Sequence, residues 1–288
     1  MKWVIAILPL LALPSAAVLL TPEVWPRWAF MWLFAWTIYA GCKWLTWWVA
    51  SAHDANWRRH LAYLVLWPGL DADAFLRKSN SCRPHLFAWL FAFAKLTVGI
   101  ALLWSAAALL ARNQDLLRGW VGMVGIVFVL HFGLFDVLGL AWQTAGIAAT
   151  PVMNWPILAT SVTDFWGRRW NTAFRDLTHR FLFRPLTIHC GAKVALLVGF
   201  AFSGLVHDLV ISLPAGAGWG GPTVFFFVQG GAIFLERSSL GRRIGLGIGV
   251  IGWAFTMLVL LGPLWLLFHS PFVRGVIVPF VDFLGGIS

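Results

Sequence analysis

The chain has 288 residues, of which 60% are hydrophobic and 11% are charged, and its mean hydropathy is +0.81. This composition excludes an ordinary soluble domain and is typical of an all-α, polytopic membrane protein. The formal net charge of +10 lies in short basic clusters between apolar runs. Membrane topology, with anionic lipid or substrate second, explains that charge better than nucleic-acid binding does.

The apolar runs predict seven or eight membrane spans, with cytoplasmic loops that form amphipathic or re-entrant helices. The eighth run, 273–286, is either a span or an interfacial tail, and 221–236 is short enough to be re-entrant. We expect the first run to be retained rather than cleaved, because no small-residue cleavage site follows it. The other predicted spans are 3–20, 28–49, 85–111, 119–142, 193–213 and 244–268.

The basic residues between the runs predict the orientation. With a cytoplasmic N-terminus, 16 of the 21 Lys and Arg residues lie inside, four lie outside and Lys95 lies in a span. The opposite orientation inverts this ratio, so the positive-inside rule predicts that the N-terminus is cytoplasmic. Two long loops, 49–84 and 143–190, are then cytoplasmic too. No repeat or shift in composition divides the sequence, which predicts a single domain over 1–288.

The second loop contains a segment with a helical pattern. Ser161 followed by Asp164 resembles a capping box, which predicts a helix that begins there. If that helix continued to residue 178, two faces would form. The apolar face would contain Trp166, Trp170, Ala173 and Leu177, and the polar face Asp164, Arg168, Asn171, Arg175 and Thr178. Such an amphipathic helix lies on the membrane or dips into it.

The two arginines of the polar face have two interpretations. Arg168 and Arg175 either clamp the phosphates of an acyl donor or anchor the loop to anionic lipid headgroups. The arginines alone favour the lipid interpretation. Asn171 by itself needs no functional explanation on a wet helix face.

His207 and Asp208 are a stronger signal, because ionisable groups are costly in a segment that is otherwise apolar. His207 lies roughly 21 Å of helix beyond Lys193, at 1.5 Å per residue. A buried neutral imidazole is the form that a general base needs. Asp208 points about 100° away around the helix, so it is not automatically the partner of His207.

Other polar residues are weaker candidates. We expect structural roles for Lys95, His131 and Asp136, with Lys95 either paired with Asp136 or directed to the interface. The scattered residues Cys42, Cys82 and Cys190 form no metal-binding spacing, so no metal site is predicted.

Two motifs carry a family resemblance. The stretch Asp164-Phe-Trp-Gly-Arg-Arg-Trp-Asn171, followed by Ser203-Gly-Leu-Val-His-Asp208, resembles the wax synthase branch of the membrane-bound O-acyltransferase superfamily. Leu66-Trp-Pro-Gly-Leu-Asp71 is similar to an earlier stretch of that branch. The main motif region covers residues 161–209. Asp208 stands where plant wax synthases have glutamate, which leaves the acceptor open.

The resemblance implies transfer of an acyl group from a thioester, acyl-CoA or an acyl carrier, to the hydroxyl of an alcohol or lipid. His207 lies at the position of the family's catalytic histidine, and Asn171 matches the asparagine that accompanies it. The remaining substrate-binding candidates are Arg168, Arg175, Trp170 and Asp208. No separate cofactor is implied. The sequence has no GxSxG elbow and no motif cysteine beside His207, so direct transfer is preferred over an acyl-enzyme.

One alternative uses the same residues differently. A proton-coupled transporter also places histidine and aspartate in the membrane, as at His207 and Asp208. The inverted repeats and paired broken helices of such proteins are missing from the sequence. A second question is how Asn171, in a cytoplasmic loop, reaches His207 deep in a span. We expect the loop to dip inward or a funnel to lead down to His207.

Overall fold

The computed structural model describes residues 2–52, 55–77 and 83–286. Within these ranges every regular element is a helix and no strand occurs, which confirms the all-α prediction. The chain forms two compact units, residues 1–152 with 276–288 and residues 153–275. The single domain over 1–288 stays a prediction. Cys82 lies outside the described residues.

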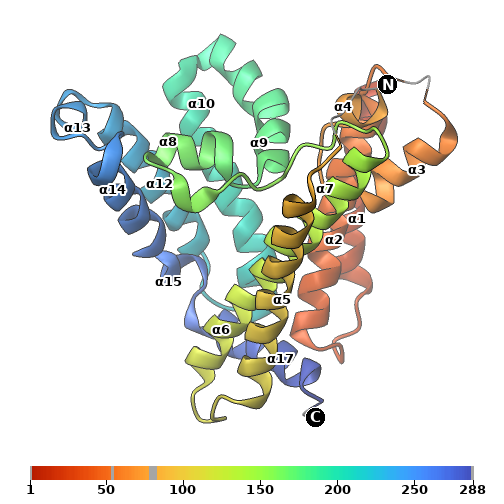
Figure 1. The fold of residues 1–288 in the computed structure, drawn as a ribbon, viewed down its shortest axis with the longest axis vertical. Coiled ribbons are helices and arrows are strands. Elements are labelled where there is room, and N and C mark those ends of the chain that lie inside the picture. Colours follow the sequence, from red (N-terminus) through yellow and green to blue (C-terminus); the bar gives the residue numbers. More distant parts are fainter. Residues whose placement is uncertain (1, 53–54, 78–82, 287–288) are drawn as a thin grey trace. The chain divides into compact units, whose positions relative to one another are not determined.

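The first unit contains the N-terminal helices and the last helix of the chain (Figure 1). Its elements are α1 (Lys2–Leu20), α2 (Arg27–Trp48), α3 (Trp57–Leu66), α4 (Ala72–Leu76), α5 (Leu86–Ala108), α6 (Asp115–Val127), the π-helical segment η1 (Phe128–Leu134), α7 (Phe135–Thr144) and α17 (Val278–Leu284). The α6, η1 and α7 segments run as one long helix. Helices α3 and α4 occupy the loop predicted over 49–84.

Glycines allow the long helices of this unit to approach closely. A Cβ on Gly99 of α5 would lie 2.6 Å from the backbone nitrogen of Val129 in η1. A Cβ on Gly133 would lie 2.9 Å from the Cα of Leu96 in α5. Backbone contact of this kind is a common way for membrane helices to pack.

The turn at residues 66–69 is held by side chains from two helices. Its carbonyl groups accept hydrogen bonds from Tyr39, Lys43 and Trp142. Lys43 is 1% exposed, and its Nζ lies 2.7 Å from the Gly69 oxygen and 3.4 Å from the centre of the Tyr63 ring. A buried ammonium group is thus satisfied by a carbonyl and an aromatic face. The stretch 66–71, which carries part of the family resemblance, thus contains a turn that is held by hydrogen bonds from these side chains.

The polar residues predicted to be structural include one ion pair. Lys95 of α5 donates to Asp136 of α7, and both side chains are less than one-fifth exposed. The pairing explains how two charges persist between apolar helices. It confirms the predicted partnership of Lys95 with Asp136.

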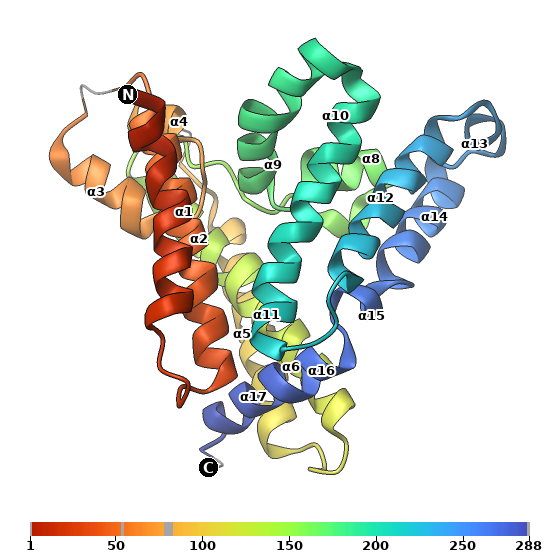
Figure 2. The ribbon, with the colours of Figure 1, turned by 180° about the vertical axis from the view of Figure 1, so that it is seen from behind.

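The second unit contains the motif region and the helices that follow it (Figures 1 and 2). Its elements are η2 (Pro156–Leu158), α8 (Val162–Asp164), η3 (Phe165–Arg169), α9 (Thr172–Thr178), η4 (His179–Phe183), α10 (Arg184–His207), η5 (Asp208–Ser212), α11 (Leu213–Ala215), α12 (Gly221–Arg237), α13 (Ser239–Ile244), α14 (Gly249–Leu261), α15 (Leu264–Leu267) and α16 (Ser270–Phe272). The division along the chain after Gly275 falls within η6 (Val273–Ile277).

Helices α10 and α12 form the frame of this unit. The backbone of α10 bends at Gly191, whose φ of 79° is a conformation that glycine adopts readily. The straight part of α10 therefore begins close to residue 193, where the predicted span begins. Both views show α10 running toward α11 and α12 returning antiparallel beside it toward α13 (Figures 1 and 2). Residues near the middle of one helix therefore face the middle of the other.

Five helical stretches of the described chain are long and apolar enough to cross a membrane: Lys2–Leu20, Leu86–Ala108, Asp115–Thr144, Thr172–Ala215 and Gly249–Leu267. Each overlaps a predicted span, although Thr172–Ala215 begins well before the predicted residue 193. Large apolar side chains point outward from them, as Ile100, Leu258 and Leu261 do at 55%, 70% and 60% exposure. These features define an integral membrane protein. The count of seven or eight spans and the re-entrant helices stay predictions.

Candidate functional site

The predicted cap of the motif helix is present. The Ser161 hydroxyl oxygen accepts a hydrogen bond from the Asp164 backbone nitrogen at 2.9 Å, and helix α8 begins at Val162. The helix continues into η3, where the Trp170 nitrogen bonds to the Phe165 oxygen at 2.9 Å. A short helix over 162–169 results, capped as expected from the serine.

The single continuous helix expected over 161–178 is wrong. Trp170 is extended, and Asn171 adopts the left-handed conformation with φ 42° and ψ 61°. A new helix, α9, begins at Thr172. Asparagine tolerates this conformation better than most residues, and its side chain favours helix starts over helix interiors. The proposed common face of Arg168, Asn171 and Arg175 therefore does not exist as one helix surface.

Asn171 has one engaged and one free side-chain group. Its Oδ1 accepts from the Phe174 backbone nitrogen at 3.1 Å and so caps α9. Its own backbone nitrogen points to the Met153 sulfur at 3.3 Å. Among the described residues, the Nδ2 amide has no hydrogen-bond partner, and the side chain is half-buried. The cap therefore orients an amide donor whose hydrogens are available.

The two motif arginines differ in their surroundings. Arg168 is exposed, and no described residue pairs with it. Arg175 donates from Nη1 to the Gly167 oxygen at 2.6 Å, and its Nη2 lies 2.6 Å from an Asp176 carboxylate oxygen. Arg175 thereby ties α9 to η3 across the break. Of the two predicted phosphate ligands, Arg168 has the free guanidinium.

Trp170 packs inside the unit. Its ring stacks on Phe165 with centroids 5.6 Å apart and an interplanar angle of 13°. Both belong to a small apolar cluster with Ala159 and Leu260. This packing gives Trp170 a structural role, and its predicted contact with substrate stays a prediction.

His207 is the last residue of α10, and one of its two ring nitrogens makes a hydrogen bond. Its Nδ1 lies 2.7 Å from the backbone oxygen of Ser203. A carbonyl oxygen only accepts, so the hydrogen of the neutral ring sits on Nδ1 and Nε2 carries a lone pair. Among the described residues, Nε2 has no hydrogen-bond partner, and the side chain is half-buried. The imidazole is in the tautomer that a general base requires.

The imidazole is placed by a close crossing of α10 and α12. A Cβ on Gly204 would lie 2.6 Å from the Thr223 Cα, so the two backbones touch there. Side chains lean toward the N-terminus of their own helix. In an antiparallel pair, His207 of α10 and Phe226 of α12 therefore lean toward each other over this crossing. Their ring centroids lie 4.7 Å apart.

Asp208 is occupied by protein contacts. It is 6% exposed and accepts from the Gly220 nitrogen at 2.9 Å, the Thr223 nitrogen at 3.2 Å, the Thr223 hydroxyl, and the Ser212 hydroxyl at 3.0 Å. The carboxylate thus satisfies the first amides of α12, where a negative charge is favourable. Asp208 is positioned to hold α12 against His207. Its substrate-binding role stays a prediction.

A second histidine, which the sequence did not single out, belongs to the Asp208 network. His269 Nδ1 accepts from the Phe272 backbone nitrogen at 3.2 Å, so Nε2 carries the hydrogen in the neutral ring. Nε2 lies 3.3 Å from the Ser212 hydroxyl, which donates to Asp208. Burial lowers the pKa of His269 below its ordinary value, although the charge of Asp208 acts in the opposite direction.

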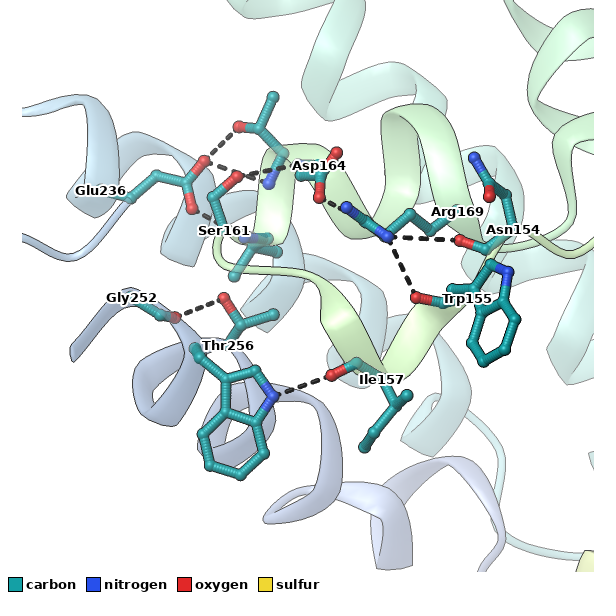
Figure 3. Close-up of polar contacts among 12 residues, drawn as sticks. Asn154, Trp155, Ile157, Ser161, Asp164, Arg169, Glu236, Gly252 and Thr256 are labelled. Carbon is teal, nitrogen blue, oxygen red and sulfur yellow. Dashed lines mark hydrogen bonds and ion pairs between the residues drawn. The ribbon is translucent and has the colours of Figure 1, made fainter. Parts of the chain in front are cut away.

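Two polar residues of α12 were also missed. Gln229 is fully buried, accepts from Trp166 Nε1 at 3.4 Å and donates to the Val259 oxygen at 3.0 Å. Glu236, 6% exposed, binds the start of the motif helix (Figure 3). Both are polar residues in the apolar run 221–236, so the argument that selected His207 could also have selected them.

The motif segment meets the His207 region through aromatic rings. Trp166 lies 6.1 Å from Phe200 of α10 and 5.4 Å from Phe226, centroid to centroid, and Phe226 in turn contacts His207. Phe174 of α9 stacks on Phe202 of α10 at 6.2 Å and 6°. No hydrogen bond or ring contact joins Asn171 to His207 in the described part of the chain. The ring contacts bring together the segments that carry the two residues, not the residues themselves.

Fold and site together define an all-helical integral membrane protein that presents a bare imidazole nitrogen and a free amide donor beside aromatic side chains. Residues 149–228 match the sequence model of the membrane bound O-acyl transferase family. That match covers both His207 and Asn171, and it confirms the predicted resemblance to the superfamily.

The matching relatives point to the wax synthase branch. The chain is 34% identical over 101 residues to a long-chain-alcohol O-fatty-acyltransferase of Simmondsia chinensis, covering 30% of this chain and 29% of the relative. It is 29% identical over 160 residues to a probable long-chain-alcohol O-fatty-acyltransferase of Arabidopsis thaliana, covering 46% and 45%. An acyl-CoA–sterol O-acyltransferase of Arabidopsis thaliana is 29% identical over 94 residues, covering 30% and 27%. Each match therefore spans less than half the length of the relative.

Proposed function

We propose that the protein is a membrane O-acyltransferase that moves a fatty acyl group from a thioester, acyl-CoA first among the candidates, to the hydroxyl of a long-chain alcohol or sterol. The observation that carries the proposal is His207, whose Nδ1–H bond to Ser203 leaves Nε2 bare within the matched family segment. The names of the relatives support both acceptor classes. Their shared reaction is ester formation.

His207 supplies the base. Nε2 takes the hydroxyl proton as the acceptor oxygen attacks the thioester carbonyl carbon. The tetrahedral intermediate collapses, the C–S bond breaks, and the proton passes from Nε2 to the departing thiolate. Phe226 and the Ser203 carbonyl hold the ring in the orientation that this transfer needs.

Asn171 supplies the oxyanion donor. The negative charge that develops on the thioester oxygen accepts a hydrogen bond from Nδ2, which the cap to Phe174 leaves free. Arg168, exposed near the same segment, is suited to the phosphates of a nucleotide-bearing donor. The N-terminus and the 143–190 loop lie on the cytoplasmic side in this proposal, where acyl thioesters are available.

Transfer is direct in this proposal. Ser203 is the one hydroxyl on the His207 face, and it donates to the Gly199 oxygen at 3.0 Å, as expected for a serine in a membrane helix. Cys190 is exposed and follows His189, but no hydrogen bond among the described residues joins its thiol to a base. Neither residue has the activated geometry of a covalent nucleophile.

The test is ester formation. Purified protein is incubated with radiolabelled acyl-CoA and a panel of fatty alcohols, sterols and diacylglycerol, and the products are separated by chain length and polarity. Label in an ester that depends on both substrates supports the proposal. In parallel, protein mixed with donor alone is examined by intact-mass spectrometry. A stoichiometric acyl adduct that disappears on adding acceptor would replace direct transfer with a covalent route.

A further inference from the structure

Glu236 lies at the C-terminal end of α12 and is one of two glutamates in the chain. Its Oε2 accepts from the Val162 backbone nitrogen at 2.8 Å, and its Oε1 accepts from the Thr163 nitrogen at 3.1 Å and from the Thr163 hydroxyl. Figure 3 shows this carboxylate directed at the first turn of the motif helix. Three donors therefore converge on one buried acid.

These contacts complete the cap of the motif helix. The first four amides of a helix have no partner within it. Here Glu236 takes the amides of residues 162 and 163, and the Ser161 hydroxyl takes that of Asp164, while the Phe165 amide makes the first bond within the helix, to the Ser161 carbonyl. Val162 is fully buried, so its amide has no access to water if Glu236 is lost.

The other end of the same helix is also fixed. Arg169 pairs with Asp164 and donates to the Trp155 oxygen at 3.2 Å (Figure 3). Its own carbonyl accepts from the Asn154 nitrogen at 2.8 Å. Asn171 follows two residues later. The motif helix is therefore fixed at both ends, by Glu236 at its start and by the contacts of Arg169 two residues before Asn171.

Helix α12 is shared by both halves of the proposed site. Glu236 holds the segment that bears Asn171, while Phe226, on the same helix, contacts the His207 ring. Trp166 of the motif helix bonds to Gln229 and packs on Phe226 between these two points. A shift of the motif helix along α12 would move Asn171 relative to the imidazole.

We propose that Glu236 is a positioning residue, which sets the register of the motif helix on α12 and so places the Asn171 amide for the oxyanion. The proposal rests on the proposed acyl transfer. Glu236 itself touches no substrate and acts only through Asn171.

A double-mutant cycle in the full-length protein tests it. Glu236→Gln keeps the shape of the side chain but turns an NH2 group toward backbone N–H donors. We expect it to lower kcat by roughly 10- to 100-fold with little change in donor KM, because small misplacements of catalytic groups act on the transition state. Glu23→Gln, the same change at the exposed glutamate, should leave kcat unchanged.

The decisive arm is the combination with Asn171→Asp, which keeps the cap to Phe174 but removes the amide donor. If Glu236 acts through Asn171, then Glu236→Gln lowers kcat no further in the Asn171→Asp background. A residue that only stabilises the fold would lower kcat by the same factor in both backgrounds, and that result would overturn the proposal. Thr163→Val, which removes only the hydroxyl donor, gives a milder variant in case Glu236→Gln folds poorly.

A measurement without substrate separates this proposal from the proposed function. Amide hydrogen exchange of the 161–171 peptide should be at least tenfold faster in Glu236→Gln than in wild type or Glu23→Gln. Unchanged exchange would remove Glu236 from its positioning role whatever the activity. An absence of ester formation by wild-type protein, with faster exchange in the variant, would instead contradict the proposed function alone.

Discussion

At the scale of single residues, Asn171 has a structural role and a proposed catalytic role, and an informative substitution removes only one of them. Its Oδ1 caps α9, and its Nδ2 is free for the proposed oxyanion. Asn171→Asp keeps an acceptor for the Phe174 amide and tolerates the left-handed backbone, but it removes the donor and adds a negative charge. Its folding should therefore be close to that of wild type.

We predict that Asn171→Asp lowers kcat by about 100-fold or more, the range for loss of an oxyanion donor. Asn171→Gly, which keeps the backbone conformation but lacks the whole side chain, should lose a similar factor. Rates are measured with saturating donor, and folding is followed by thermal unfolding in detergent. An aspartate variant with wild-type kcat would exclude Asn171 as the donor.

Arg168 and Arg180 offer a matched pair of exposed arginines, one inside the stretch Asp164–Asn171 and one outside that stretch. If Arg168 binds donor phosphates, then Arg168→Glu should raise the donor KM by roughly tenfold and steepen its dependence on salt. Arg180→Glu should change neither. Equal effects of both variants on donor kinetics would support general attraction to anionic lipid instead.

The same scale explains what the sequence could and could not predict about the site. His207 was predictable because an ionisable group in an apolar run is rare. The roles of Asp208 and Arg175 were not, because hydrogen bonds to the Gly220 amide and the Gly167 carbonyl depend on tertiary packing. Gln229 and Glu236 are also polar residues in an apolar run, as His207 is. Their run, 221–236, is short for a membrane span, so the sequence did not decide whether it crosses the membrane.

At the scale of elements, the crossing of α10 and α12 sets the geometry around His207. Gly204 and Thr223 are in backbone contact there. Gly204→Ala places a Cβ 2.6 Å from the Thr223 Cα, so the helices must separate. Gly199, five residues earlier on α10, has open space around it, and Gly199→Ala is the matched control.

We predict that Gly204→Ala destabilises the protein by about 1–3 kcal/mol through overpacking and lowers kcat by at least tenfold. Gly199→Ala should be neutral or slightly stabilising, because alanine favours helix over glycine. Thermal unfolding and ester formation measure the two effects. If both variants behave alike, the close crossing does not place His207.

The helix break at Trp170–Asn171 marks the limit of pattern reasoning at this scale. The spacing of polar residues over 164–178 fits a helical period, yet the backbone leaves the helix at Asn171. Periodicity cannot distinguish one long helix from two short ones that share a phase. Asparagine was the available signal, because its side chain favours caps over helix interiors.

At the scale of the whole molecule, hydropathy predicted where the long helices lie, since each of the five apolar stretches overlaps an expected span. It could not predict the division at residue 153 into two compact units, because both units have the same membrane-like composition. Orientation rests on the distribution of basic residues alone.

Thiol labelling tests that orientation. With Cys42 and Cys82 replaced by serine, exposed Cys190 should react with a membrane-impermeant maleimide from the cytoplasmic side only. Glu23→Cys, in the turn between α1 and α2 and in a background that also lacks Cys190, should react from the opposite side only. Intact and opened cells are compared by gel shift. Labelling of both positions from the same side would contradict the predicted topology.

The central claim is that the bare Nε2 of His207 drives acyl transfer. His207→Ala and His207→Gln are compared with wild type and with His179→Ala, a change at an exposed histidine, in the ester-forming assay with acyl-CoA and a fatty alcohol. The account predicts that both His207 variants fold, bind donor and form less than about one-thousandth of the wild-type ester, near the upper limit for loss of a catalytic base, while His179→Ala is fully active. Ester formation by His207→Ala at more than a few per cent of the wild-type rate would contradict it.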